Sequence, residues 1–188
     1  MTTPPARRQR VDAQRNYERL MAAADDAFAR DGIGASLEKI AKTAGVAIGT
    51  VYSHFPTRED LLAHLIAERM NRLTDLGRRL LDREDADAAL FEWLEAFGAG
   101  AATYQGLPDS VIRNLHDPQS PLFNSCETMR RTCGALLERA QGAQQVRADA
   151  TATGVLAMTA ALHSAAAAGD QPTSHFLEVL FDGLRTRP

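Results

Sequence analysis

The sequence predicts an all-α protein of about nine helices, in which a three-helix head containing a helix-turn-helix precedes a longer helical body. Apolar residues recur at three- and four-residue spacing along most of the 188 residues, which is the periodicity of helices with one buried face. No alternating stretch is long enough to predict a strand, and glycine or proline separates most of the successive helical stretches. With 45% hydrophobic and 24% charged residues, the chain has the composition of a soluble globular protein.

The chain is expected to begin with a disordered basic arm, residues 1–12, because its first ten residues hold two prolines and three arginines. A helix is predicted from about Ala13 to Arg30. Asp31 and Gly32 end it, since glycine readily takes the positive φ found at helix C-termini. The apolar face of this helix consists of Leu20, Ala24, Ala27 and Phe28.

Two short helices joined by a tight turn follow. Ser36 is a favourable N-cap for a helix over residues 37–44, and Gly45 supplies the backbone conformation of the turn. The next helix begins near Ala47, and the pair forms the helix-turn-helix pattern. Helical hairpins of this spacing also occur as ordinary core elements. The positions that must be apolar to hold the pair together are Ile40, Ala41, Val46, Val51 and Phe55.

The fourth helix is predicted from Arg58 to about Asp82, which is roughly 37 Å at 1.5 Å per residue. Thr57 caps it together with Asp60, three residues later. Further helices are predicted over residues 86–104, 110–115, 123–142 and 151–168, and from Thr173 onward. The predicted parts of the chain are the arm 1–12, a helix-turn-helix domain 13–56 and a helical body 57–188.

The charge of the chain is unevenly distributed. The net charge is −3, yet residues 1–19 carry five arginines against two acidic residues, a local balance of +3. Residues 61–188 carry 12 basic and 16 acidic side chains, a balance of −4. A basic end on an acidic body indicates a local anion-binding surface, although basic tails are also often merely solvated.

One segment resembles a known family. The run "ASLEKIAKTAGVAIGTVYSHFPTREDLLAHLI" resembles the DNA-binding head of the TetR family of bacterial transcriptional regulators, over roughly residues 14–66. Its most specific part is the spacing G-V-x-x-G-T-V-Y-x-H-F. The resemblance implies a ligand-binding and dimerisation domain after the DNA-binding head, linked to it by the fourth helix. The segment "LLERAQGAQQVRADA" resembles a C-terminal pattern of one TetR subgroup.

The resemblance implies that the short third helix lies in the major groove of DNA, with its N-terminal residues facing the bases. Gly49 lets the backbone approach the duplex, and the Thr50 and Tyr52 hydroxyls suit phosphate oxygens. Ile48 suits the methyl group of thymine. Tyr52 as a core aromatic and His54 as a plain surface residue are the alternatives. The expected DNA-binding residues are Ser36, Lys39, Ala47, Ile48, Gly49, Thr50, Tyr52, Ser53, His54 and Arg58.

The recognition helix departs from a typical DNA-reading helix in two ways. It carries no lysine or arginine, so bidentate recognition of guanine from this helix is not expected. Ala47 stands where a capping residue is usual, and an alanine N-cap costs about 1 kcal/mol. Positive charge is expected from Lys39, Lys42, Arg58 and the arm, which would reach the adjacent minor groove.

The body is expected to hold an effector pocket, because ligand pockets are mostly apolar with few polar anchors. A neutral or modestly polar organic molecule is the expected effector. Ordinary core packing is the alternative for every residue assigned to this pocket, including the histidine. The candidate lining residues are Trp93, Phe97, Tyr104, Phe123, Met129, Cys133, Met158 and His163.

The last two helices are expected to form a homodimer, since two such helices from each subunit make a four-helix bundle. The alternative is that both helices only close the core of the monomer. A twofold dimer implies a pseudo-palindromic operator. The candidate interface residues are Val155, Thr159, Leu162, Ala166, Phe176, Leu177, Leu180, Phe181 and Leu184.

Enzymatic, metal and membrane functions find no support in the sequence. It contains no HExxH, phosphate-binding glycine loop or G-x-S-x-G motif, and no cofactor or metal is expected. No apolar run is long enough to span a membrane, and no signal peptide is recognisable, so a cytoplasmic location is expected. Cys126 and Cys133 are expected to be buried free thiols. The alternative functions are a ligand-independent DNA- or protein-binding module and a regulator that responds to thiol oxidation.

Overall fold

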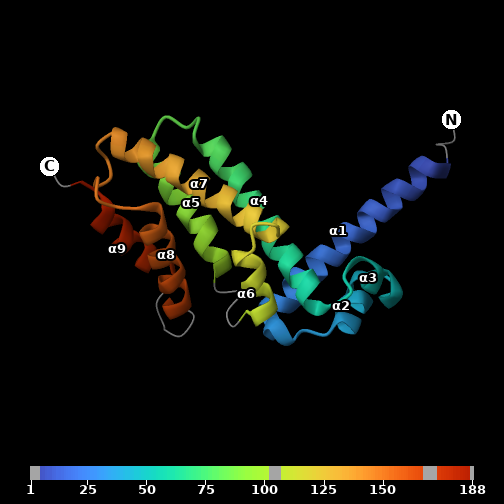
Figure 1. Ribbon diagram of the computed structural model, residues 1–188. Coiled ribbons are helices and arrows are strands. Elements are labelled where there is room, and N and C mark those ends of the chain that lie inside the picture. The colour runs from blue at the N-terminus through green and yellow to red at the C-terminus, as the bar shows by residue number, and fades with distance from the viewer. Residues whose placement is uncertain (1–4, 102–106, 167–172, 187–188) are drawn as a thin grey trace.

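Helices account for nearly all of the computed structural model, which describes residues 5–101, 107–166 and 173–186 (Figure 1). Within these ranges short turns and loops connect the helices, and Val146 and Arg185 form an isolated β-bridge. The head lies at one end of an elongated molecule and α8 and α9 lie at the other. The head consists of α1 (Pro5–Asp31), the 3-10 turn η1 (Gly32–Gly34), α2 (Leu37–Ala44) and α3 (Ile48–His54). The body consists of α4 (Arg58–Leu80), α5 (Ala86–Ala101), α6 (Asp109–His116), α7 (Pro121–Gly142), α8 (Ala152–Ala166) and α9 (Thr173–Leu184).

The prediction of a disordered arm is wrong for residues 5–12, which form the first part of α1. Pro5 occupies the first position of the helix, where proline is tolerated because its missing N–H has no intrahelical partner there. The alanine, arginine and glutamine residues that follow are good helix formers. The first helix is therefore longer than predicted. Residues 1–4 of the predicted arm lie outside the described residues.

The helix-turn-helix forms as its turn residues predict. The Ser36 hydroxyl accepts a hydrogen bond from the backbone N–H of Lys39 (3.3 Å) and caps α2. Gly45 ends α2 at φ +66°, in the left-handed region that glycine adopts without a steric penalty. Ala47 caps α3 without any side-chain hydrogen bond. The fully buried Val51 anchors α3 to the head.

Helix α4 belongs to both parts of the molecule. Thr57 and Asp60 form the predicted capping box at its start. Its first turns place Leu61 and Leu65 in the core of the head. Its last turns place Leu73 and Leu80 in the core of the body. A displacement of α4 by the body would therefore reach the head directly.

The remaining helices pack around α4, α5 and α7, which lie side by side (Figure 1). Trp93 of α5 is fully buried at their meeting point, and its Nε1–H donates to the Leu73 carbonyl oxygen at 2.8 Å. Gly77 of α4 allows this approach, because a methyl group there would overlap the side chain of Thr132. Helix α8 crosses α5 equally closely, with the His163 ring lying against Gly98. In the described ranges no helix is long and apolar enough to cross a membrane.

Candidate nucleic-acid interface

Helix α3 presents nearly all of its side chains to solvent. Within this helix Val51 is the buried residue, while Tyr52 is 45% and Ile48 is 36% exposed. Nine of the ten residues predicted to bind DNA are exposed, and the tenth, Ser36, is half-buried. Tyr52 is therefore not a core aromatic, and the predicted contact residues lie on an open face of the head.

Two details of the exposed face concern the predicted contacts of Gly49 and Ser53. Gly49 faces open space, since no atom lies within 4 Å of the position that a Cβ would take. The Ser53 hydroxyl turns back on its own helix and donates to the Thr50 carbonyl oxygen at 2.8 Å. A contact from Ser53 to DNA would therefore require its hydroxyl to leave that bond.

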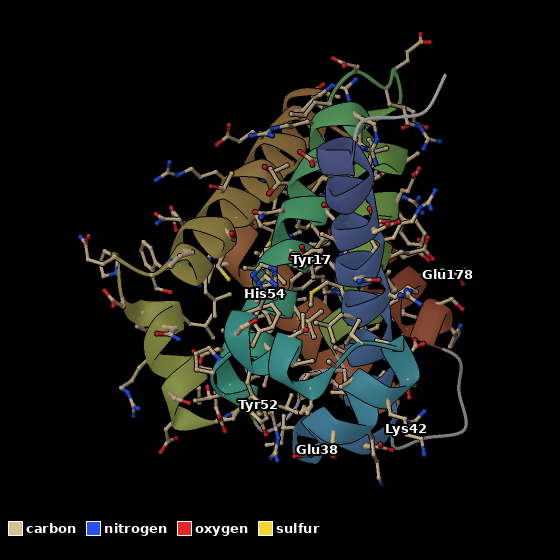
Figure 2. All side chains as sticks on the ribbon, turned by 90° about the vertical axis from the view of Figure 1, so that its right-hand side faces the viewer. Tyr17, Glu38, Lys42, Tyr52, His54 and Glu178 are labelled. Carbon is tan, nitrogen blue, oxygen red and sulfur yellow. The ribbon has the colours of Figure 1, made fainter. Side chains whose placement is uncertain are left out.

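Glu38 is a member of this face that the sequence interpretation missed. The Ser36 hydroxyl donates to its Oε2 at 2.7 Å, and the Tyr52 hydroxyl donates to its Oε1 at 3.4 Å. Figure 2 shows Glu38 and Tyr52 close together at the edge of the head, with Lys42 on the same side. The hydrogen bond from Ser36, then those from its own backbone N–H and from Tyr52, and the charge of Arg58 hold the pKa of Glu38 below its ordinary value. An ionised carboxylate therefore lies between two hydroxyl groups that were assigned to DNA.

Positive charge surrounds α3 rather than lying on it. Lys39 and Lys42 are exposed on α2, and Arg58 is exposed at the start of α4. The Arg19 guanidinium lies next to the turn, 3.4 Å from where a Cβ of Gly45 would be. The exposed cations near α3 therefore come from its neighbours in the chain, α1, α2 and α4.

A polar cluster ties α1 to α4 behind this face. The Tyr17 hydroxyl contacts Nε2 of His64 and donates to Oε1 of Glu68 at 2.9 Å. Desolvation first, and then the hydrogen bond and charge of Glu68, raise the pKa of Tyr17 to about 12. The His64 ring also packs on Phe55, with the ring centroids 5.2 Å apart. The residue that ends α3 is thereby connected to α4 and α1.

The described residues among those predicted to line an effector pocket are divided between the body core and separate positions nearer the surface. Met129, Cys133 and Trp93 are buried in the body core, and Phe97 stacks on Trp93 at 5.8 Å between centroids. Their packing is the core alternative stated above. Tyr104 lies outside the described residues. The others are dispersed: Phe123 is half-buried on α7, Met158 is 47% exposed on α8, and His163 lines a separate recess with α5 and α9.

The predicted dimer residues require a correction. Six of the nine are buried inside the monomer, because they face the body core rather than solvent. They are Val155, Thr159, Ala166, Leu177, Phe181 and Leu184. Leu162, Phe176 and Leu180 are half-buried and line an open apolar groove of about 420 Å³ between α8 and α9, together with Met158, Ala161 and Val179.

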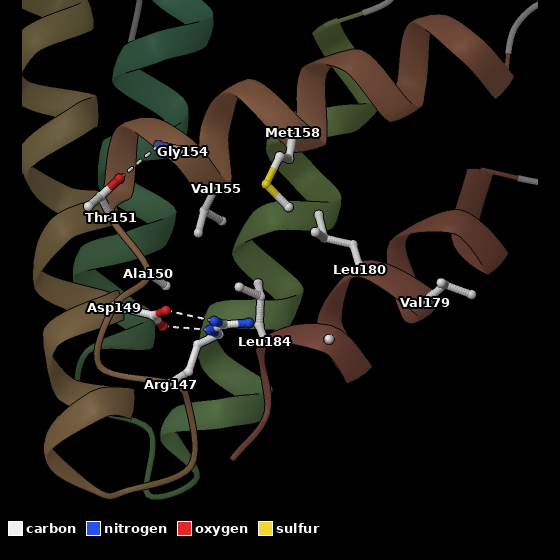
Figure 3. A pocket seen from close by; sticks show the side chains of 11 residues that line it. Arg147, Asp149, Ala150, Thr151, Gly154, Val155, Met158, Val179, Leu180 and Leu184 are labelled. Carbon is white, nitrogen blue, oxygen red and sulfur yellow. Dashed lines mark hydrogen bonds and ion pairs between the residues drawn. The ribbon is translucent and has the colours of Figure 1, made fainter. Parts of the chain in front are cut away.

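The groove continues toward the loop before α8 as a second hollow of about 480 Å³ (Figure 3). Met158, Val179 and Leu180 line both hollows. The ion pair between Arg147 and Asp149 closes the far end. The outer surface of α8 and α9 is therefore an exposed apolar strip with one charged end.

Neither cysteine is suited to sense oxidants. Cys126 is 5% exposed and Cys133 is fully buried. Burial raises the pKa of both thiols, to about 12 for Cys133, so little of the reactive thiolate forms at neutral pH. Across the described ranges no group of three or more metal-ligating side chains comes together.

Comparisons with known proteins agree with this arrangement. Residues 20–65 match the family of bacterial regulatory proteins named after tetR, and residues 85–186 match the C-terminal domain of SbtR-like transcriptional regulators. A TetR transcription regulatory protein from Mycobacterium vanbaalenii is 33% identical, with 95% of this chain and 99% of that chain covered and a TM-score of 0.70. A TetR transcriptional regulator from Streptomyces coelicolor is 29% identical, with 91% and 99% covered and a TM-score of 0.70.

Among curated proteins, the HTH-type transcriptional regulator LuxR of Vibrio harveyi is 40% identical over 73 residues. Those residues make up 36% of this chain and 36% of that protein. The match to this curated relative thus spans about a third of its length, whereas the matches to the two solved structures span nearly the whole of each.

Proposed function

Because the chain belongs to the TetR family of bacterial regulatory proteins and is a DNA-binding transcriptional regulator, we propose that it is a repressor that a small-molecule effector releases from a pseudo-palindromic operator. The observation that carries the DNA-binding site is the open face of α3. Apart from Val51, its side chains point away from the core of the head. Exposed hydroxyls, an apolar side chain and surrounding cations are the groups that phosphates and major-groove edges require.

In this proposal Ile48 contacts a base, while Tyr52 and Thr50 contact phosphates. Lys39, Lys42 and Arg58 add electrostatic affinity that falls with salt, because each neutralised phosphate releases a counterion. Gly49 allows the backbone of α3 to come close to the duplex. Positions 48 and 52 are four residues apart, so their side chains lie on one face of the helix.

We further propose that the exposed strip on α8 and α9 joins two copies of the chain. Val179 is 59% and Met158 is 47% exposed, and both line the apolar groove between the helices. A second copy that packs its own α8 and α9 there would complete a four-helix bundle. Two heads related by a twofold axis would then bind two half-sites of a pseudo-palindrome.

Helix α4 would carry the signal from effector to DNA. It contributes to both cores, and the Tyr17, His64 and Glu68 cluster fastens it to α1. An effector that displaced α4 would change the separation of the two α3 helices in the dimer. The burial of both cysteines counts against the alternative of release by thiol oxidation. A ligand-independent module on the same fold remains the second candidate, because the predicted pocket residues are dispersed.

The test begins with selection of duplexes from a random pool by the purified protein, followed by binding measurements over a range of salt concentrations. Tyr52→Ala should weaken binding to every sequence alike, whereas Ile48→Ala should relax preference mainly at one base pair. Ile112→Ala is the matched control, because Ile112 is 41% exposed but lies on α6. Unchanged operator affinity in both head variants would refute the assignment of this face.

A further inference from the structure

Glu38 places a negative charge on the face that is proposed to bind DNA. The phosphates would repel this carboxylate unless a hydrogen-bond donor on the DNA compensates for it. It is exposed in the first turn of α2, and it is held by the hydroxyls of Ser36 (2.7 Å) and Tyr52 (3.4 Å). Tyr52 lies on the same face of α3 as Ile48, one turn away. The Glu38 side chain is therefore next to the part of α3 that is assigned to the major groove.

A carboxylate in this place meets two kinds of group on a duplex. The phosphates repel it at every sequence. The compensating donors in the major groove are the exocyclic amino groups, N4 of cytosine and N6 of adenine. On adenine the N7 acceptor lies beside the N6 donor, and N7 repels a carboxylate. Cytosine presents its N4 donor without a neighbouring acceptor. The chemistry of the groove therefore favours cytosine opposite Glu38.

We propose, building on the proposed DNA-binding function, that Glu38 determines specificity by accepting a hydrogen bond from N4 of one cytosine in each half-site. In the free protein the Ser36 and Tyr52 hydroxyls both hold the carboxylate in position. On binding, Ser36 keeps its hydrogen bond while the Tyr52 hydroxyl turns to a phosphate, so the carboxylate is already ordered and the entropy cost is lowered. At any site without an amino group in that place, the charge stays uncompensated. Glu38 thus acts as much by weakening wrong sites as by binding the correct one. This accounts for base selection by a head whose recognition helix lacks lysine and arginine.

The test compares duplexes selected from a random pool by the wild type, by Glu38→Gln and by Glu59→Gln. Glutamine keeps the size and shape of the side chain but removes the charge. Its single oxygen accepts from one of the two hydroxyls, and its NH2 group can donate to the other. Glu59 is the matched control, because it is the second residue of α4 as Glu38 is the second residue of α2. Neither substitution is in the core, so the folded fraction should not change.

The wild type and Glu59→Gln should both enrich cytosine at one position of each half-site. Glu38→Gln should lose that preference by about tenfold, with adenine gaining at the same position because glutamine pairs with its N6 and N7. Other positions should keep their preferences. If Glu38→Gln instead bound all sequences more tightly with every base preference retained, Glu38 would be a repulsive surface charge and the inference would be overturned.

The failure of the proposed function gives a different result. In that case the wild type itself enriches no sequence, and the inference falls together with the function. A selected wild-type site whose base preferences survive in Glu38→Gln overturns the inference about Glu38 alone.

Discussion

At the scale of single residues, we expect Gly49 to lower the stability of α3 and to favour the proposed DNA binding. Glycine inside a helix is less stable than alanine by about 0.5–1 kcal/mol, and a Cβ at this position meets nothing within 4 Å in the free protein. Gly49→Ala should therefore raise the free energy of unfolding by about 0.5–1 kcal/mol. Its affinity for the operator should fall, because the added methyl group lies between the backbone and the duplex. Urea denaturation and DNA titration measure the two effects.

Gly134→Ala is the control for this change. Gly134 lies in α7, and a Cβ added there would also have no atom within 4 Å, so this variant should gain similar stability without loss of DNA affinity. If Gly49→Ala bound the operator as tightly as Gly134→Ala does, close approach of the α3 backbone to DNA would be disproved.

Tyr17 couples stability to alkaline pH. Its pKa is about 12 in the folded protein, against 10.0 ordinarily, so the stabilisation by its neutral form is complete below pH 10 and is lost as the pH rises toward 12. Below pH 9, Tyr17→Phe should be less stable than the wild type by about 1 kcal/mol, because the hydrogen bond to Glu68 is lost. This difference should shrink between pH 10 and 12.

Urea denaturation of both proteins at several pH values tests this dependence. Tyr52→Phe controls for the loss of a phenol hydroxyl at a surface position. A stability difference between wild type and Tyr17→Phe that stayed constant through the whole alkaline range would contradict the coupling of Tyr17 to Glu68.

At the scale of elements, helices were predictable where one face is apolar and the ends carry clear signals. Helix α2 begins after Ser36 and ends before Gly45, as predicted. Thr57 and Asp60 form the expected capping box at the start of α4. The start of α1 was missed, because proline and arginine are as common in disordered tails as at helix starts. Composition alone does not separate these two cases.

The last two helices show where periodicity stops being informative. In α8 small and apolar residues occur on every face, so the spacing does not reveal which side meets the core. The residues predicted for the dimer are therefore mostly ones buried inside the monomer, while Val179 and Met158 are exposed. Glu38 is not recognisable in the sequence for a related reason, because its contact with Tyr52 joins residues that are 14 positions apart.

The crossing of α5 and α8 depends on a glycine and histidine pair. A methyl group at Gly98 would overlap the His163 ring, whose Nδ1 is hydrogen-bonded to the Thr159 carbonyl oxygen at 3.0 Å. Gly98→Ala should cost about 1–3 kcal/mol of stability through overpacking. Combined with His163→Ala, which removes the ring, the same change should cost little.

A double-mutant cycle measured by urea denaturation gives the coupling between the two positions. The double variant should be more stable than the sum of the single effects predicts. Simple additivity would show that α5 and α8 accommodate the methyl group by moving apart, and that the close crossing is not maintained by this pair.

At the scale of the whole molecule, the two cores are joined through α4 and α7. The core of the head includes Val111 of α6 and both Leu122 and Cys126 of α7, besides its own helices. Met70 of α4 packs against both cores. A rearrangement in the body can therefore reach the head through packed side chains of α4, α6 and α7. Regulation of DNA binding by an effector requires such a mechanical connection between the two parts.

The proposed dimer makes the most direct prediction at this scale. A charge on the exposed strip of α8 and α9 would be buried without a partner on association, so Val179→Asp should dissociate the dimer. Sedimentation should then give the monomer mass of 20.4 kDa. The operator affinity should fall by roughly 100-fold or more, because the two heads no longer bind as one unit. Ile112→Asp places the same charge at an exposed position on α6 and should leave both the mass and the affinity unchanged. A dimer that survived Val179→Asp with its affinity intact would place the twofold contact elsewhere on the molecule.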